Sequence, residues 1–138
     1  MQQTVMINSR PQDAYRRQDI LTANSLDLVV MLYDALKKNI ILGKRRIAKN
    51  DVQGAHNHLM KAQEIVTALI NSLDMNYQIS EDLLSIYDFI LRSAEEANTK
   101  KDPAPLEPLI EIVEDLRSAW DEIRTSAKGS TYLSEEQS

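Results

Sequence analysis

The histidines are the first residues to test for chemistry, because helical bundles often hold metals with Glu-x-x-His pairs that project into the core. The chain contains two histidines, His56 and His58, and no cysteine. Residues two apart on a helix point about 200° away from each other, so these histidines cannot share a metal there. Neither has a carboxylate three or four residues away. We therefore expect no metal, no cofactor, no cysteine-based zinc site and no disulfide.

One arrangement around His58 could support phosphotransfer. The segment His58-Leu59-Met60-Lys61-Ala62 resembles the His-x-x-Lys-Gly motif of histidine phosphotransfer domains, which are four-helix bundles of this size. A neighbouring lysine would stabilise a phosphohistidine electrostatically. Ala62 stands where that motif has glycine, and it belongs to an apolar seam. A histidine phosphotransfer domain using His58 is thus the alternative to a histidine at the edge of the core.

The charged residues are unevenly distributed along a chain whose net charge is −5. Six basic residues and no acid lie between positions 37 and 49, whereas seven acids and one arginine lie between 102 and 122. Basic residues near the C-terminus of a helix complement its dipole, and the basic run has no interleaved aromatic residues for base stacking. The alternative, an RNA- or phosphate-binding patch, is less favoured, and we expect no nucleic-acid partner. Five acids on helical faces are interpreted as solvated surface rather than catalytic groups: Glu95, Glu96, Glu111, Glu114 and Asp115.

The elements that position these residues are helices. Four segments have amphipathic helical spacing, at about 26–49, 52–73, 80–101 and 105–127. Asn50-Asp51 ends the first and caps the second, Ser80 caps the third, and Pro108 falls in the first turn of the fourth. Connections this short predict an all-α, antiparallel up-down four-helix bundle with a short N-terminal helical arm. We expect a flexible arm at 1–12, one bundle domain at 13–127 that includes the short helix, and a disordered tail at 128–138.

The first long helix is apolar nearly all round. Its apolar residues fall into three groups: Val29, Leu32, Tyr33, Leu36 and Ile40; Leu28, Met31, Ala35 and Leu42; and Val30 with Ile41. One stripe suffices to join a bundle, so the excess predicts cover by a partner or by a homodimer. Asp34, Lys37, Lys38 and Asn39 interrupt the run too early for a bilayer span. The N-terminus lacks the pattern of a signal peptide, and we expect a cytoplasmic location.

Several short blocks of the sequence resemble the flagellin-specific export chaperones, the FliS family, from about Ala14 to Trp120. The blocks occur in the family's order and spacing: Ala14-Tyr15, Leu21-Thr22-Ala23 with Ser25, Met31-Leu32-Tyr33-Asp34, Lys61-Ala62-Gln63, Leu84-Ser85-Ile86-Tyr87-Asp88-Phe89, Glu96-Ala97-Asn98-Thr99-Lys100-Lys101-Asp102 and Leu116-Arg117-Ser118-Ala119-Trp120. No single block is specific, and the joint signal is strong.

The resemblance implies a cytoplasmic chaperone that is not an enzyme. Such a chaperone binds the C-terminal segment of flagellin, prevents premature polymerisation, and assists export through a component of the flagellar type III export gate. An amphipathic segment of the partner would lay its apolar face into grooves of the bundle. Tyr33 and Tyr87 are expected in the core, with Asp34 and Asp88 exposed.

The residues expected to contact the partner fall into three sets. The arm contributes Tyr15, Ile20 and Leu21, which should lie over apolar bundle surface and move when the partner arrives; the first long helix contributes Leu28, Met31 and Leu42; and the second and third helices offer Ile65 and Leu91. We expect a monomer or weak dimer without membrane insertion.

Overall fold

The computed structural model describes residues 26–137, with side chains through Ser126. Within this range the chain forms four α-helices, one short 3-10 helix and no strand. The elements are α2 (Leu26–Ala48), α3 (Val52–Asn71), α4 (Ile79–Lys100), the 3-10 helix η2 (Ala104–Leu106) and α5 (Glu107–Gln137). The predicted all-α fold is confirmed. The predicted arm helix at 13–21 lies outside the described residues.

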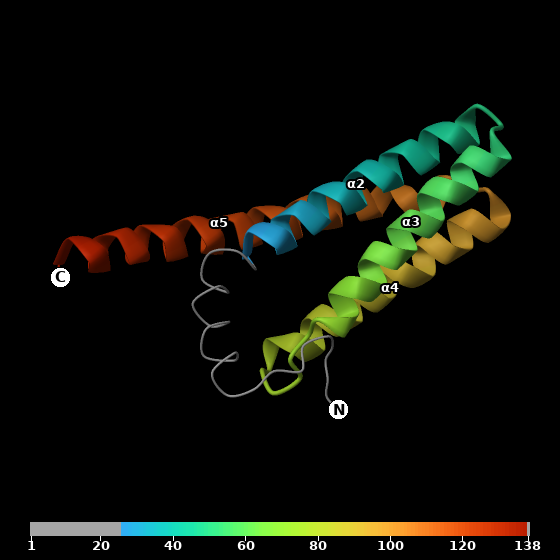
Figure 1. The fold of residues 1–138 in the computed structure, drawn as a ribbon. Helices are drawn as coiled ribbons and strands as arrows, with labels where there is room; N and C mark the ends of the chain where they lie inside the picture. Colours follow the sequence, from blue (N-terminus) through green and yellow to red (C-terminus); the bar gives the residue numbers. More distant parts are fainter. Residues whose placement is uncertain (1–25, 138) are drawn as a thin grey trace.

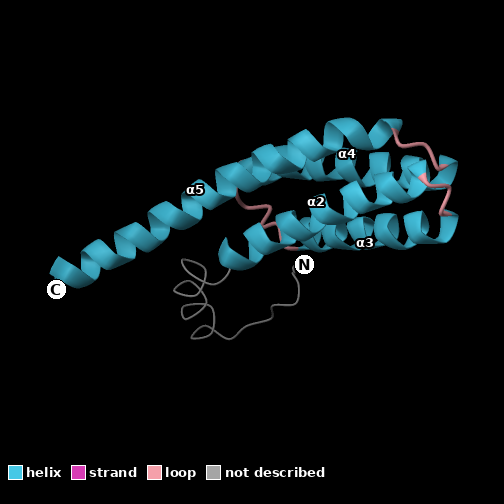
Figure 2. Ribbon diagram, turned by 90° about the horizontal axis from the view of Figure 1, so that it is seen from above, coloured by secondary structure: helices cyan, strands magenta, loops and turns pink. Residues whose placement is uncertain are grey.

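Successive helices run antiparallel, with α2 packed against both α3 and α5, and α3 packed against α4. The α2–α3 and α4–α5 connections lie at one end of the bundle and the α3–α4 connection at the other (Figures 1 and 2). The up-down order therefore follows the short connections expected from the sequence.

The ends of the helices show where local sequence signals hold and where they fail. Asp51 caps α3, as predicted, by accepting a 2.9 Å hydrogen bond from the Gly54 amide. The prediction that Ser80 caps the third helix is wrong, because α4 already begins at Ile79. Ser80 is buried, and its hydroxyl donates to the Asp74 carbonyl at 2.6 Å instead. This buried bond ties the first turn of α4 to the start of the α3–α4 connection.

The core runs through all four helices. It includes Tyr33, Leu36 and Ile40 of α2; Leu59, Ala62, Ile65, Val66 and Leu69 of α3; Leu83, Tyr87, Ile90 and Ala97 of α4; and Leu106, Leu109 and Val113 from η2 and α5. The expectation that Tyr33 and Tyr87 are core residues is confirmed: Tyr33 is 0% exposed and Tyr87 is 2% exposed. Asp34 and Asp88 are exposed, also as expected. The two hydroxyls are hydrogen-bonded to each other, and the ring centroids are 6.5 Å apart.

These tyrosines are held in their neutral form. Burial raises the pKa of the Tyr33 phenol well above its usual range, Tyr87 adds to the rise, and a hydrogen bond from the Trp120 side chain partly opposes it. Burial likewise raises the pKa of Tyr87, and the hydrogen bond with Tyr33 partly lowers it. The pair thus joins α2 to α4 across the core without carrying charge.

The helix α5 extends farther than the sequence indicated. It starts at Glu107, directly after η2, which places Pro108 in its first turn as expected. Its helical backbone continues to Gln137, past the domain boundary predicted at 127, and projects beyond the rest of the bundle (Figure 1). No proline follows Pro108, so each turn can propagate the next.

Candidate functional site

The outward face of α2 carries residues at alternating spacings of three and four. We call this set the outer stripe: Leu28, Met31, Ala35, Lys38, Leu42, Arg45 and Lys49, of which the first six lie in α2 and Lys49 follows its end. This is the spacing with which one helix packs along another in a coiled coil. Leu28 is 54% exposed and Met31 is 63% exposed. Leu28 and Met31 therefore place accessible apolar surface on the outward side of α2.

The other sides of α2 are occupied by the bundle, which is why this stripe faces outward. Toward α5, Lys37 pairs with Glu114 at 2.7 Å and Arg117 donates to Asp34 at 2.8 Å. Lys44 also pairs with an acid of α5, Glu107. These contacts turn one edge of α2 toward α5. The stripe lies on the side away from the core, except that Ala35 also packs against it.

The edge of α2 that faces α3 is set by a histidine. His58 Nδ1 donates to Asn39 Oδ1 at 3.1 Å, which joins α3 to α2. His56 instead accepts from Asn98 Nδ2 of α4 at 3.2 Å, so the two histidines serve different helix pairs. No group of three His, Cys, Asp or Glu in the described part of the chain could hold a metal. The histidines thus act here as links between helices.

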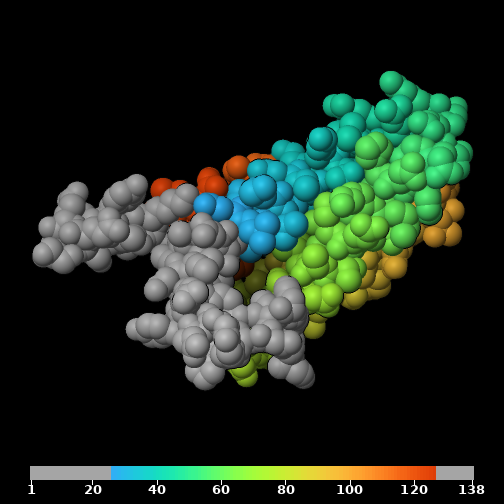
Figure 3. All heavy atoms as spheres, in the orientation of Figure 1, coloured from blue at the N-terminus to red at the C-terminus, as the bar shows by residue number. Residues whose placement is uncertain are grey.

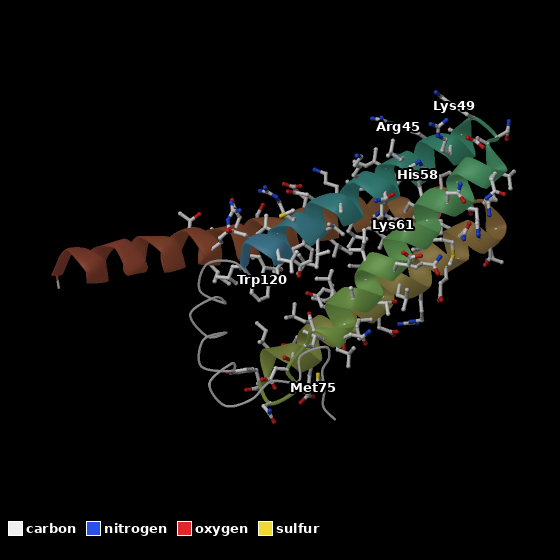
Figure 4. The ribbon with its side chains drawn as sticks, viewed as in Figure 1. Arg45, Lys49, His58, Lys61, Met75 and Trp120 are labelled. Atoms are coloured by element: carbon white, nitrogen blue, oxygen red, sulfur yellow. The ribbon has the colours of Figure 1, made fainter. Side chains whose placement is uncertain are left out.

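The outer stripe changes character along its length. Its first half is apolar, while its second half places the cations Lys38, Arg45 and Lys49 around Leu42. Figure 4 shows Arg45 and Lys49 at the outer edge of α2, pointing away from the other helices. In the space-filling view, α2 and α3 form one continuous face (Figure 3). The stripe could hold an amphipathic segment along most of α2.

A shallow open depression lies beside the cationic half. It has a volume of about 410 Å³ and is lined by Asp34, Lys37, Lys38, Ile41, Leu42 and Arg45. Ile41 and Leu42 are half-buried and belong neither to the core nor to the apolar residues packed on it. They supply an apolar floor with charged walls, the mixture found in sites that orient a ligand by a few polar groups.

The structure separates the residues that the sequence proposed as partner contacts. Leu28 and Met31 are exposed and Leu42 is half-buried, all on one stripe. Leu91 is half-buried against the core, and Ile65, only 6% exposed, is a core residue that offers almost no surface. Residues Tyr15, Ile20 and Leu21 of the arm lie outside the described range.

Sequence reasoning missed two features. The first is an exposed apolar group around the α3–α4 connection, made by Met75, Tyr77 and Ile79. Apolar residues inside a short connection were the available signal. The second is that the unpaired cations share a stripe with Leu28 and Met31, which reading the spacing through position 49 would have found.

Among the described residues, every helix is too short or too polar to span a lipid bilayer.

Comparison with known proteins identifies a family that this chain resembles along most of its length. The family model described as "Flagellar protein FliS" matches residues 6–127. The flagellar secretion chaperone FliS of Bacillus subtilis is 32% identical over 115 residues, which are 83% of this chain and 86% of that protein. The protein of the same name from Vibrio cholerae is 33% identical over 98 residues, which are 70% of this chain and 72% of that protein.

The fold also matches a solved structure. A crystal structure described as a flagellar chaperone from bacteria superposes with a TM-score of 0.70, covering 82% of this chain and 96% of the other. The two sequences are 16% identical in this match, so it shows a shared fold.

Proposed function

The chain belongs to the FliS family of flagellar secretion chaperones, and from this premise we propose that it binds the C-terminal segment of flagellin in the cytoplasm. Bound in this way, the segment is kept from premature polymerisation, and the complex delivers it to a component of the flagellar type III export gate. The family is one of chaperones, not enzymes, and phosphotransfer through His58 is not proposed further.

The observation that carries this proposal is the exposure of Leu28 and Met31 on a helix whose remaining faces are already packed. Exposed apolar side chains aligned at helix-packing spacing favour a helical partner. A segment without stable structure of its own pays an entropic cost when it becomes ordered, so it needs a long apolar contact in return. The outer stripe offers Leu28, Met31 and Leu42 for that contact, spread along most of α2.

The proposal is tested by titrating the protein with a flagellin C-terminal peptide in a calorimeter at several temperatures. Burial of apolar surface should give a large negative heat-capacity change. Met31→Asp should weaken binding by roughly tenfold or more, because it places a charge against the apolar face of the peptide. The far-ultraviolet circular dichroism should stay unchanged, since Met31 is 63% exposed.

Met75→Asp is the matched control. Met75 is 51% exposed and lies in the α3–α4 connection, at the end of the bundle away from Arg45 and Lys49 (Figure 4). Binding should survive this change. A peptide that binds Met31→Asp as tightly as the parent would place the site elsewhere. If Met31→Asp only dissociates a dimer in sedimentation experiments, the stripe is instead a self-association surface.

The proposal extends to the N-terminal arm. An apolar surface awaiting a partner is best shielded in the free protein by a weakly held segment, and Tyr15, Ile20 and Leu21 give the arm three apolar anchors. Amide exchange across residues 13–21 should then be slowed in the free protein and become faster when the flagellin peptide is added. High protection that the peptide leaves unchanged would contradict this role.

A further inference from the structure

The six cations between positions 37 and 49 divide into two sets of three. Lys37, Lys44 and Arg46 each pair with an acid of this chain: Glu114, Glu107 and Asp51 respectively. Lys38, Arg45 and Lys49 are exposed and make no ion pair or side-chain hydrogen bond within the described part of the chain. The bundle therefore neutralises the cations at its edges and leaves those on the outer stripe available.

These unpaired cations are arranged along the stripe in a defined direction. Lys38, Arg45 and Lys49 occupy its C-terminal half, around Leu42, while Leu28 and Met31 occupy its N-terminal half. An aligned partner must meet both halves. The complement is a helix with apolar residues at three-four spacing along its length and acids gathered over one half.

The helix dipole decides which half of the partner carries the acids. Acidic side chains stabilise a helix near its N-terminus and destabilise it near its C-terminus. A helix with acids in its first turns can meet the cations near Lys49 only if it runs antiparallel to α2. We infer that the outer stripe selects an antiparallel amphipathic helix whose acidic N-terminal half lies over Lys38, Arg45 and Lys49 and whose apolar C-terminal half lies over Leu28 and Met31.

Other occupants fit these residues less well. Nucleic acid would use the cations, but Leu28, Met31 and Leu42 would gain nothing, and a net charge of −5 opposes its approach. The outer face of α5 in a second copy offers the exposed acids Glu111, Asp115 and Glu122. Between these acids α5 places Ser118 and Ala119 outward, and Ile123 is the only large apolar side chain exposed among its described residues. It therefore supplies little apolar surface for Leu28 and Met31.

The inference rests on the proposed function in using the same stripe, but its test does not need flagellin. Two designed three-heptad peptides of identical composition, with leucine at the a and d positions, serve as probes. The acid-first peptide carries its glutamates in the N-terminal half, and the acid-last peptide carries them in the C-terminal half. Fluorescence anisotropy should show that the acid-first peptide binds roughly tenfold more tightly in about 0.05 M NaCl. The preference should shrink in about 0.5 M NaCl, where exposed charges are screened.

Variants of the protein assign that preference to the stripe. The double variant Lys38→Gln/Arg45→Gln should reduce the preference, and Lys38→Glu/Arg45→Glu should reduce it further. The part that remains in both comes from the helix dipole of the peptides themselves. Both sites are exposed, and circular dichroism checks that the helices remain. Arg92→Glu is the matched control, because Arg92 is an exposed cation of α4 whose ion pair with Asp88 stays within its own helix. It should leave the preference unchanged.

Three results would overturn the inference. They are equal binding of the two peptides, an unchanged preference in the Glu double variant, and tighter binding of a short RNA oligonucleotide that the same double variant abolishes. If the acid-first peptide binds as expected and the flagellin peptide does not, the proposed function fails while the inference stands. If the flagellin peptide binds and the two designed peptides bind equally well, the inference fails while the proposed function stands.

Discussion

The inner and outer faces of α2 both carry apolar side chains at helical spacing, but these side chains differ in how much of them is exposed. Tyr33, Leu36 and Ile40 are fully buried, whereas Leu28 and Met31 on the same helix are more than half exposed. Apolar pattern alone therefore does not distinguish a core from a docking surface. The difference comes from the neighbours, because α3 and α5 cover one side of α2 and leave the other open.

The largest expected difference between the faces is in their contribution to stability. Leu36→Ala should lower the free energy of unfolding by about 2–5 kcal/mol, because it leaves a cavity in the core. Leu28→Ala should change it by less than about 0.5 kcal/mol, since the side chain is 54% exposed. Urea denaturation followed by circular dichroism measures both. Similar losses from the two variants would erase the distinction between the faces.

The hydroxyl pair tests whether the inner face is also fixed by polar contacts. Tyr33→Phe should cost about 1–3 kcal/mol, because it leaves the buried Tyr87 hydroxyl without its partner. Tyr33→Phe/Tyr87→Phe should cost less than the sum of the two single changes. Strict additivity in denaturation experiments would show that the hydroxyls act independently.

Gly43 tests how closely the inner face approaches α3. A Cβ at position 43 would lie 2.6 Å from Leu59 Cδ2, and Leu59 is fully buried. Gly43→Ala should therefore destabilise the protein by about 1–3 kcal/mol in spite of the higher helix propensity of alanine. Gly43→Ala with Leu59→Ala supplies the control, because it removes the clash. If Gly43→Ala instead raises the free energy of unfolding, α2 and α3 can move apart at this position with little loss of stability.

Alkaline pH should weaken the inner face through its two tyrosines. Both tyrosine pKa values are raised in the folded protein, so the unfolded chain, with a tyrosine pKa of 10.0, ionises first. The stability from the neutral pair is fully present below pH 10 and is lost as the pH rises from there toward the folded pKa values. The loss should approach about 1.4 kcal/mol per pH unit for each tyrosine. Above pH 10, the urea concentration at the midpoint of unfolding should fall with rising pH. The fall should be less steep in Tyr33→Phe/Tyr87→Phe than in the parent protein.

The smallest expected effect lies at the boundary between the two faces. Lys37→Gln removes a partly exposed ion pair with Glu114 and should cost less than about 1 kcal/mol. Lys38→Gln removes a cation without a partner in the described chain and should change stability even less. Thermal melts at low and high salt compare the two. A larger loss from Lys38→Gln would indicate an intramolecular role for the outer cations.

The sequence predicted the helices well because each carries apolar residues at helical spacing, and Asp51 supplies a local cap. It could not predict which side of α2 stays open, since that depends on how α3 and α5 are placed around it. The Ser80 cap failed for a related reason, because the hydroxyl has a competing carbonyl at Asp74, six residues away. Likewise, Ile65 flanks the seam of its helix in sequence, and only the packed neighbours show that it is buried.

The packing of α5 on α2 joins helices that lie farther apart in sequence than α2 and α3 or α3 and α4 do. This difference in sequence separation predicts an order of folding. Lys37 and Glu114 are 77 residues apart in sequence, whereas α2–α3 and α3–α4 pair as immediate neighbours. The entropic cost of closing a loop grows with its length, so the two hairpins should form before α5 docks. By the same reasoning, α5 should be the first helix to detach in a partial opening. The outer stripe faces away from that seam, so the chaperone could keep its proposed docking face while its last helix is released.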